Sequence, residues 1–254
     1  MQKRKIAFFL ISLILLLTVY LFRYPLFLWF QCSRLTGLSC GKANCMNRIW
    51  AHRVNSTERY KILKDKFSGF EMDIIYTGSE KGFAVLHPPA AVVGDTLTLD
   101  AYLSQADLLN DRFWFDTRFL DTSNMQKGLV VLDELTKKYP QIKECILEIY
   151  DLPSAQLLAE NGYTVSFNVS EKWLNDLSGN NSLRDSVALS LRHVKYVSQD
   201  AAYLPRVKKL FPGKKILTWH LAIKDFLNRK PLKALLADQQ VELVLVNIKT
   251  PYFQ

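Results

Sequence analysis

Acidic side chains occupy two neighbouring β-rich runs in the first half of the sequence. Glu71 and Asp73 stand two residues apart, so both side chains point to the same face of a strand. Asp116 lies in the next long β-rich run. Three carboxylates brought together repel one another unless a cation lies between them, and all-oxygen coordination favours Mg²⁺ or Ca²⁺ over zinc. We therefore predict that these three residues bind a divalent cation.

Two of the four histidines flank these acids in the sequence. His52 lies near the end of the run before Glu71, and His87 closes a short run after Asp73. Imidazoles titrate near neutral pH, which suits proton transfer beside a metal site. The alternative interpretation is that each acid forms an ion pair with a lysine or arginine. It explains any single acid equally well, but it explains the whole set of acids and histidines less well.

The elements that must position these residues alternate regularly from residue 48 onward. We expect eight strands, at Ile49–Val54, Gly69–Tyr76, Arg112–Phe119, Glu144–Tyr150, Tyr163–Val169, Lys195–Gln199, Lys215–Leu221 and Val241–Ile248. Helical patterns lie between them, at Thr57–Phe67, Lys127–Lys138, Ser154–Glu160, Ser170–Leu177, Ser182–Arg192, Leu204–Phe211 and Lys224–Asp238. The pattern predicts an α/β fold, a (β/α)₈ TIM barrel over residues 48–254.

A doubly wound open sheet is the competing architecture. Such a sheet usually has a Gly-rich phosphate loop after its first strand, and His52-Arg53-Val54-Asn55 is not one. One insertion interrupts the alternation, at Gly82–Leu103, and it contains a short expected strand, Phe83–His87. In a TIM barrel the site lies at the carboxyl ends of the strands, where His52, the acids and His87 are expected.

Other polar residues also fall at interior or strand-end positions. Glu148 is expected to point into the barrel as a fourth carboxylate, or to pair with an interior lysine or arginine. Asn168 shares a strand face with Ser166, which is consistent with a pocket position. Two further polar residues, Gln199 and Asn247, fall near strand ends.

The ordered motifs resemble those of a known group of barrels. His52-Arg53, then Glu71-x-Asp73, then His87 is similar to the glycerophosphodiester phosphodiesterase and spider-toxin phospholipase D group. A longer set resembles the menorin family within residues 49–120, namely Trp50-Ala51-His52-Arg53-Val54-Asn55-Ser56, Glu71-Met72-Asp73, Leu86-His87-Pro88-Pro89 and Phe115-Asp116-Thr117-Arg118. Leu217-Thr218-Trp219 is similar to a late-strand tryptophan of the phosphodiesterases.

The resemblance implies roles for individual residues. It implies that the three acids are metal ligands and that His52 and His87 form a general acid/base pair, or a nucleophile and an acid. It further implies that Arg53 and Arg118 bind phosphate charge and that Trp219 stacks on or bounds a head group, a core tryptophan being the alternative. Arg118 stands where related phosphodiesterases often have lysine, so its role is open. Together with Glu148 and Asn168, these residues form the expected substrate site.

The positive charge of the chain is concentrated at its amino end. The net charge is +9, but residues 1–48 hold seven basic and no acidic residues, which leaves 26 basic against 24 acidic in the rest. A global nucleic-acid interaction is therefore not expected. Ile6–Phe22 is uncharged and mainly apolar after Lys3-Arg4-Lys5, which predicts an uncleaved signal anchor. A cleavable signal peptide fits less well, because no small-residue site follows the run.

The chain is thus expected to divide into a cytoplasmic basic tip at 1–5, a transmembrane anchor at 6–30, a linker at 31–47 and the barrel at 48–254. Positive flanks stay cytoplasmic, so the barrel is expected on the periplasmic, extracellular or lumenal side of a single-pass protein. An oxidising compartment would permit a disulfide among Cys32, Cys40 and Cys45. Cys145 lies in an apolar run and is expected in the core.

Three functions are compatible with these features. The first is a membrane-anchored, metal-dependent phosphodiesterase that acts on glycerophosphodiesters or phospholipid head groups by histidine acid/base catalysis. The second is a non-catalytic, menorin-like binding or adhesion module that retains the metal site. A glycoside hydrolase is less favoured, because its two carboxylates usually come from separate strands and need no histidines, whereas Glu71 and Asp73 share one strand.

Overall fold

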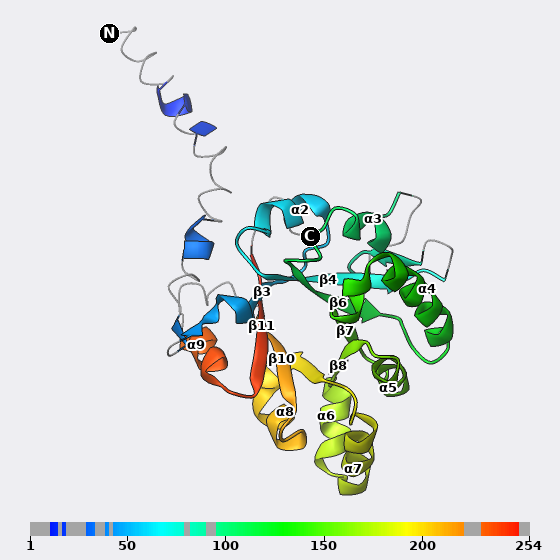
Figure 1. Ribbon diagram of the computed structural model, residues 1–254. Helices are drawn as coiled ribbons and strands as arrows, with labels where there is room; N and C mark the ends of the chain where they lie inside the picture. The colour runs from blue at the N-terminus through cyan, green and yellow to red at the C-terminus, as the bar shows by residue number, and fades with distance from the viewer. Residues whose placement is uncertain are drawn as a thin grey trace.

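Eight parallel strands close into a barrel, and helices cover its outer surface (Figure 1). The structure is a computed structural model, and it describes residues 11–14, 17–18, 29–33, 39–40, 43–78, 82–89, 95–220 and 230–248. The predicted TIM barrel is confirmed.

The barrel strands agree closely with the predicted β-rich runs. They are β3 (Ile49–Ala51), β4 (Gly69–Tyr76), β6 (Arg112–Arg118), β7 (Ile146–Ile149), β8 (Thr164–Asn168), β9 (Tyr196–Asp200), β10 (Lys215–His220) and β11 (Val241–Val246). Hydrogen bonding follows the order β3-β11-β10-β9-β8-β7-β6-β4, and a pairing between Ala51 and Phe70 closes the ring. β3 ends earlier than predicted, because Arg53 adopts a left-handed backbone with φ 57° that leaves the strand.

Helices follow the strands as the periodicity predicts. They are α2 (Thr57–Leu63), α4 (Met125–Lys138), α5 (Leu152–Glu160), α6 (Glu171–Ser178), α7 (Asn181–Ser190), α8 (Leu204–Leu210) and α9 (Lys230–Ala237). Ser56 caps α2, since its hydroxyl accepts a hydrogen bond from the Arg59 amide at 3.2 Å. The first part of the last predicted helix, residues 224–229, lies outside the described residues.

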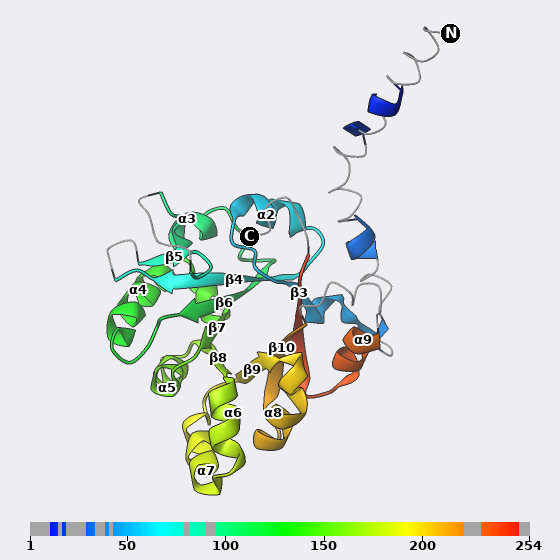
Figure 2. The ribbon, with the colours of Figure 1, turned by 180° about the vertical axis from the view of Figure 1, so that it is seen from behind.

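The insertion after β4 adds a ninth strand to the sheet. β5 (Phe83–Val85) runs antiparallel to the carboxyl half of β4, as Figure 2 shows from behind. The Leu86 amide donates a hydrogen bond to the Asp73 carbonyl at 3.0 Å, so the residue that follows, His87, is held beside the carboxyl end of β4. A helix of five residues, α3 (Leu99–Leu103), also lies in this insertion. It was not predicted, because one short turn carries little periodicity.

Two apolar cores surround the strands. The larger fills the space between the strands and the helices and includes Phe70, Met72 and Ile74 of β4. The smaller fills the interior of the barrel towards the amino ends of its strands, called the lower interior below, and the part towards the carboxyl ends is the upper interior. The smaller core consists of Trp50, Trp114, Ile146, Tyr196, Leu217, Leu243 and Leu245. Because side chains alternate along a strand, Gly69, Glu71 and Asp73 face the interior while Phe70, Met72 and Ile74 face the helices.

The predicted anchor falls largely outside the described part of the chain. The basic tip, residues 1–5, and most of residues 6–30 are not described. Within the described residues, no helix has the length and apolar character needed to cross a bilayer. The predicted linker contains a two-stranded antiparallel pair, β1 (Ser39–Cys40) with β2 (Ala43–Asn44), and the short 3₁₀ helix η1 (Cys45–Arg48). Cys32 is a free thiol, and the side chains of Cys40 and Cys45 lie outside the description.

We predict that Gly69→Ala destabilises the barrel by about 1–3 kcal/mol, a usual cost of overpacking a filled core. A Cβ at position 69 would lie 2.1 Å from Cδ2 of Trp50, whose indole closes the lower interior. The free energy of unfolding from chemical denaturation measures the loss. Gly179→Ala is the matched control, because nothing lies within 4 Å of its added Cβ. Equal stability of the two variants would contradict the packing described here.

Candidate metal centre at the barrel mouth

Strand register brings the three predicted acids together. Asp73 of β4 pairs with Asp116 of β6, and Glu71 lies one inward-facing position below Asp73. One carboxylate oxygen from each residue lies within 4.8 Å of the others. All three side chains are buried, with at most 6 % of any residue exposed. The carboxylates predicted from the sequence therefore converge.

Burial and mutual repulsion make this arrangement unfavourable without a positive charge. Desolvation, reinforced by Asp73 and Asp116, raises the pKa of Glu71 well above its usual range. Desolvation also raises the pKa of Asp116 to about 6, against the attraction of Arg118. Arg118 donates from Nε to Asp116 Oδ2 at 3.0 Å, and the same nitrogen lies 3.8 Å from Asp73 Oδ1. The ion pair with a basic residue, which was the alternative to metal binding in the sequence analysis, is therefore present at Asp116.

Backbone and amide groups hold the other two acids in place. The Arg53 amide donates to Glu71 Oε2 at 2.7 Å, from the left-handed turn that ends β3. The side chain of Asn55 bonds Asp73 twice, donating to Oδ2 at 2.8 Å and accepting from the Asp73 amide at 2.9 Å. Asn55 was part of the sequence motif, but no role had been predicted for it.

The residues fit a divalent cation. Among the described residues, Glu71 Oε1 and Asp116 Oδ1 are buried acceptor atoms without a hydrogen-bond donor. Buried acceptors are costly to leave unsatisfied, and hard cations take carboxylate oxygens. Glu71, Asp73 and Asp116 would hold the ion.

His52 is oriented by the last barrel strand. Its Nδ1 lies 2.6 Å from Oδ1 of Asn247, which only accepts, so Nδ1 carries the hydrogen. Its Nε2 lies 3.4 Å from Glu71 Oε2. Burial lowers the pKa of His52 to about 4, although the bond to Asn247 opposes this, so the imidazole is neutral at pH 7. Nε2 therefore presents a lone pair towards the acids.

His87 approaches the acids from the other side. Its Nε2 lies 3.8 Å from Asp73 Oδ1 and has no hydrogen-bond partner among the described residues. It follows β5, so the insertion rather than a barrel strand supplies this imidazole. The structure thus brings both predicted histidines to the acid cluster.

A small cavity opens beside the acids at the carboxyl ends of the strands. Its volume is about 100 Å³, and it is lined by His52, Arg53, Glu71, Asp116, Arg118, Glu148, Tyr150, Trp219 and Leu245. The Arg118 guanidinium lies over the Tyr150 ring, 6.0 Å from its centroid. Tyr150 had not been predicted as a site residue. Its position two residues beyond Glu148 on the same face was the available signal.

Glu148 points into the barrel interior as a fourth carboxylate, which is the first of the two predicted alternatives, and it lines the cavity with Glu71 and Asp116. The predicted alternative, an ion pair with an interior lysine or arginine, is not what holds it within the described part of the chain. Its carboxylate accepts hydrogen bonds from three neutral donors, Trp114 Nε1 at 3.1 Å, Asn168 Nδ2 at 2.9 Å and the Ser198 hydroxyl. Desolvation and the nearby Asp116 raise its pKa to about 8. Asn168, predicted as a substrate-site residue, does not line the cavity. Its side chain instead donates to Glu148, which does line it.

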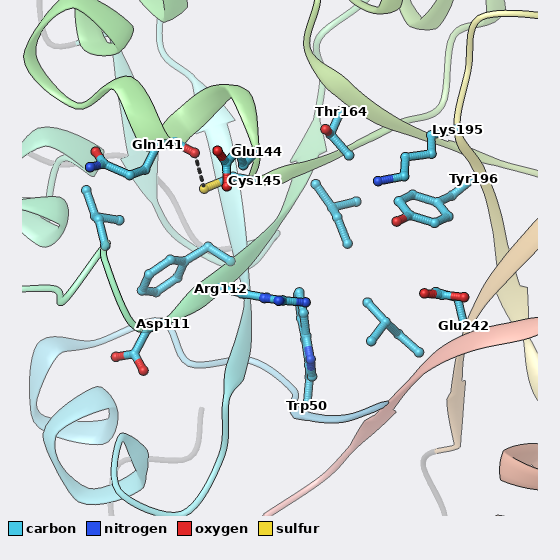
Figure 3. Close-up of a pocket in the computed structure, with 14 residues that line it drawn as sticks. Trp50, Asp111, Arg112, Gln141, Glu144, Cys145, Thr164, Lys195, Tyr196 and Glu242 are labelled. Carbon is cyan, nitrogen blue, oxygen red and sulfur yellow. Dashed lines mark hydrogen bonds between the residues drawn. The ribbon is translucent and has the colours of Figure 1, made fainter. Parts of the chain in front are cut away.

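A larger cavity lies at the opposite end of the barrel (Figure 3). Its volume is about 370 Å³, and charged residues such as Arg112, Glu144 and Lys195 surround it. Its one thiol, Cys145, donates weakly to the Gln141 carbonyl, and burial raises its pKa to about 12. This end holds the amino ends of the strands, where a TIM barrel is not expected to do chemistry, and Cys145 is the predicted core residue.

Comparison with known proteins finds similar structures but no similar sequences. The sequence matches no protein-family model and no curated protein. A glycerophosphodiester phosphodiesterase from Parabacteroides distasonis has a TM-score of 0.56 at 13% identity, covering 79% of this chain and 92% of that one. One from Thermotoga maritima has a TM-score of 0.52 at 13% identity, covering 78% and 93%.

A third similar structure was solved with a reaction product. It is a phosphodiesterase from Oleispira antarctica in complex with sn-glycerol-3-phosphate, with a TM-score of 0.51 at 10% identity. It covers 79% of this chain and 93% of that one. At these identities the likeness establishes the fold, and this chain has the barrel architecture of glycerophosphodiester phosphodiesterases.

We predict that Mg²⁺ or Ca²⁺ raises the melting temperature, and more strongly at pH 8 than at pH 5. The folded-state pKa values of Glu71 and Asp116 are raised, so the contribution of these two acids to the stability of the metal-free barrel is greatest when they are protonated at low pH. That stability is lost as pH rises through the folded pKa, which for Asp116 is about 6. A cation replaces the lost protons.

Differential scanning fluorimetry of the full chain in detergent, with and without chelator, measures this effect. Glu71→Gln should abolish the metal-dependent shift and stabilise the metal-free protein at pH 8. Glu134→Gln, at an exposed acid far from the site, is the matched control and should keep the shift. A metal shift that is independent of pH, or that survives Glu71→Gln, would argue against the site.

Proposed function

We propose that this protein is a metal-dependent phosphodiesterase that acts on glycerophosphodiesters or phospholipid head groups. The observation that carries the proposal is the convergence of Glu71, Asp73 and Asp116, with His52 and His87 at 3.4 Å and 3.8 Å from two of the acids. The barrel is shared with phosphodiesterases of known structure, one of them solved with sn-glycerol-3-phosphate. Fold alone would not carry the proposal, since such barrels host many reactions.

The two imidazoles are suited to different steps of proton transfer. A bound divalent cation would supply positive charge to the non-bridging phosphate oxygens. His52 has its Nδ1 hydrogen engaged by Asn247, so its Nε2 lone pair is available for one of two roles. It can accept a proton from an attacking water, or it can attack phosphorus itself and be released when water then breaks the new bond between nitrogen and phosphorus. We assign His87 as the acid that donates a proton to the leaving alkoxide as its bond to phosphorus breaks.

The remaining predicted residues supply charge and shape around the phosphate. Arg118 is half-buried, and Asp116 engages its Nε at 3.0 Å, which leaves the terminal nitrogens of the guanidinium for a phosphate oxygen. Arg53 and Trp219 line the same cavity. We infer that Trp219 bounds the group attached to phosphate, since it stands at the cavity wall and packs against the lower interior core.

The finer resemblance to the menorin family supports the same site. Motifs that carry it include Trp50–Ser56 and Phe115–Arg118, and they contribute His52, Asn55, Asp116 and Arg118 to the site. We propose that the chain is menorin-like on this ground.

We also propose that residues 6–30 anchor the barrel to a membrane on its non-cytoplasmic side. The support is the apolar run Ile6–Phe22 with its basic flank, Lys3-Arg4-Lys5. A tether would keep the barrel near lipid and raise the effective concentration of a lipid substrate.

We predict that His52→Ala and His87→Ala each lower the turnover of bis(p-nitrophenyl) phosphate or a lysophospholipid by about 10²-fold or more, the usual contribution of a positioned acid or base. Initial rates of the full chain in detergent, with and without chelator, measure the effect. His193→Ala, at an exposed histidine at the other end of the barrel, is the control and should match the wild type. Unchanged turnover in both site variants would remove their catalytic role. A wild type that binds metal but hydrolyses nothing in a wider diester panel would favour the binding module.

For the anchor, we predict that the wild-type chain resists alkaline carbonate extraction from membranes. Leu13→Arg with Leu17→Arg should release it, because each central arginine costs about 2.5–3.5 kcal/mol in a membrane helix. Leu109→Arg, at an exposed position of the barrel, is the control. Release of the wild type by carbonate would refute the anchor.

A further inference from the structure

A buried arginine lies directly behind His52. Arg59, in the first turn of α2, is fully buried. Its terminal nitrogen Nη2 donates to the His52 carbonyl at 3.1 Å and to the Ile248 carbonyl at 2.7 Å. One nitrogen thus joins the segment that follows β3 to the segment that follows β11, which lie at opposite ends of the sequence.

These two segments also carry the pair that orients the imidazole. Asn247, next to Ile248, accepts the hydrogen bond from His52 Nδ1 at 2.6 Å. The His52 amide donates to the Val246 carbonyl at 3.0 Å. The position of the imidazole therefore depends on the register between two loop segments that have left the strands. The bond from the His52 amide to the Val246 carbonyl is the last backbone hydrogen bond between the two segments in the described part of the chain. Arg59 joins them just beyond it, through the carbonyls of His52 and Ile248.

The backbone of Arg59 is itself fixed. Its amide donates to the Ser56 hydroxyl that caps α2, at 3.2 Å. Its charge is attracted to Glu71, and although burial lowers the pKa of Arg59 to about 10, the guanidinium stays protonated at neutral pH. Burying this cation costs desolvation free energy, which its hydrogen bonds and the nearby acids must offset. Charges are rarely buried without such specific partners, so the contacts of Arg59 indicate its role.

We propose that Arg59 is a positioning residue that holds the His52 imidazole in register with Asn247 and the acids. The inference rests on the proposed function for its catalytic consequence, but the orientation of His52 is testable without any substrate. Misplacing a reacting group by about 1 Å can cost about 10²-fold in rate. Loss of Arg59 should therefore lower kcat while leaving KM nearly unchanged, because Arg59 does not line the cavity.

Arg48 offers a matched control at the opposite end of the same two strands. It is an arginine just before β3, and it donates to the carbonyls of Leu236, Asp238, Val241 and Glu242 around the start of β11. Arg48→Met and Arg59→Met both remove a guanidinium that joins these parts of the chain. Only the second removal is adjacent to His52.

The experiment compares Arg59→Met, Arg59→Lys and Arg48→Met in the full chain in detergent. Two readouts are used, kcat and KM for bis(p-nitrophenyl) phosphate, and the ¹⁵N shifts of His52, assigned against a His52→Gln spectrum. We expect Arg59→Met to lower kcat by about 10- to 100-fold and to shift the Nδ1 and Nε2 signals away from a single Nδ1–H tautomer. Arg59→Lys, which keeps the charge and donors, should restore part of both. Arg48→Met should change neither, although it lowers the melting temperature.

The outcomes separate the two proposals. If Arg59→Met keeps the wild-type His52 shifts and loses no more kcat than Arg48→Met, the positioning role is overturned. If Arg59→Met does not fold, Arg59→Gln, which is shorter and uncharged, decides, and wild-type His52 shifts in that variant overturn the role. If the wild type hydrolyses no diester, the proposed function fails, while a changed His52 tautomer in Arg59→Met still supports the positioning role.

Discussion

The mutual repulsion of three buried carboxylates is the constraint around which the rest of the barrel is arranged. One carboxylate oxygen from each of Glu71, Asp73 and Asp116 lies within 4.8 Å of the others, and all three residues are buried. Such a cluster is stable only if protons, hydrogen-bond donors or cations offset the charge. The surrounding structure supplies several donors, an ion pair from Arg118 and the attraction of the buried Arg59, but it leaves two carboxylate oxygens without a donor among the described residues. That shortfall is what a divalent cation would fill.

The charged and the apolar side chains of the barrel interior lie at different levels along the strands. The acids lie towards the carboxyl ends and the apolar cluster lies towards the amino ends. The lower interior is filled by tryptophan and aliphatic side chains, and Gly69 leaves the space that the Trp50 indole occupies. The upper interior holds Glu148, whose carboxyl oxygens accept hydrogen bonds from Trp114, Asn168 and a serine and not from a lysine or arginine. Neutral donors stabilise a carboxylate without adding a fixed positive charge that would compete with a bound cation.

The imidazoles depend on parts of the fold that lie outside the regular strand order. His52 follows the first barrel strand but takes its orientation from Asn247 after the last, so its geometry exists only when the barrel closes. His87 follows β5, which exists because the chain turns back along β4. A reaction that needs both imidazoles therefore needs complete closure and an ordered insertion, which couples activity to the stability of the whole barrel.

The sequence alone determined the strands, most of the helices and the identity of the acid and histidine cluster. Those features depend on local periodicity and on the rule that parallel strands present their carboxyl ends together, so Glu71, Asp73 and Asp116 could be placed in advance. Only the tertiary structure decided the partners. Asn55, Arg59 and Asn247 act through contacts that span 7 to 195 residues, and Glu148 is held by donors from three other strands. Such pairings follow from register and loop conformation, such as the left-handed Arg53, which no local pattern encodes.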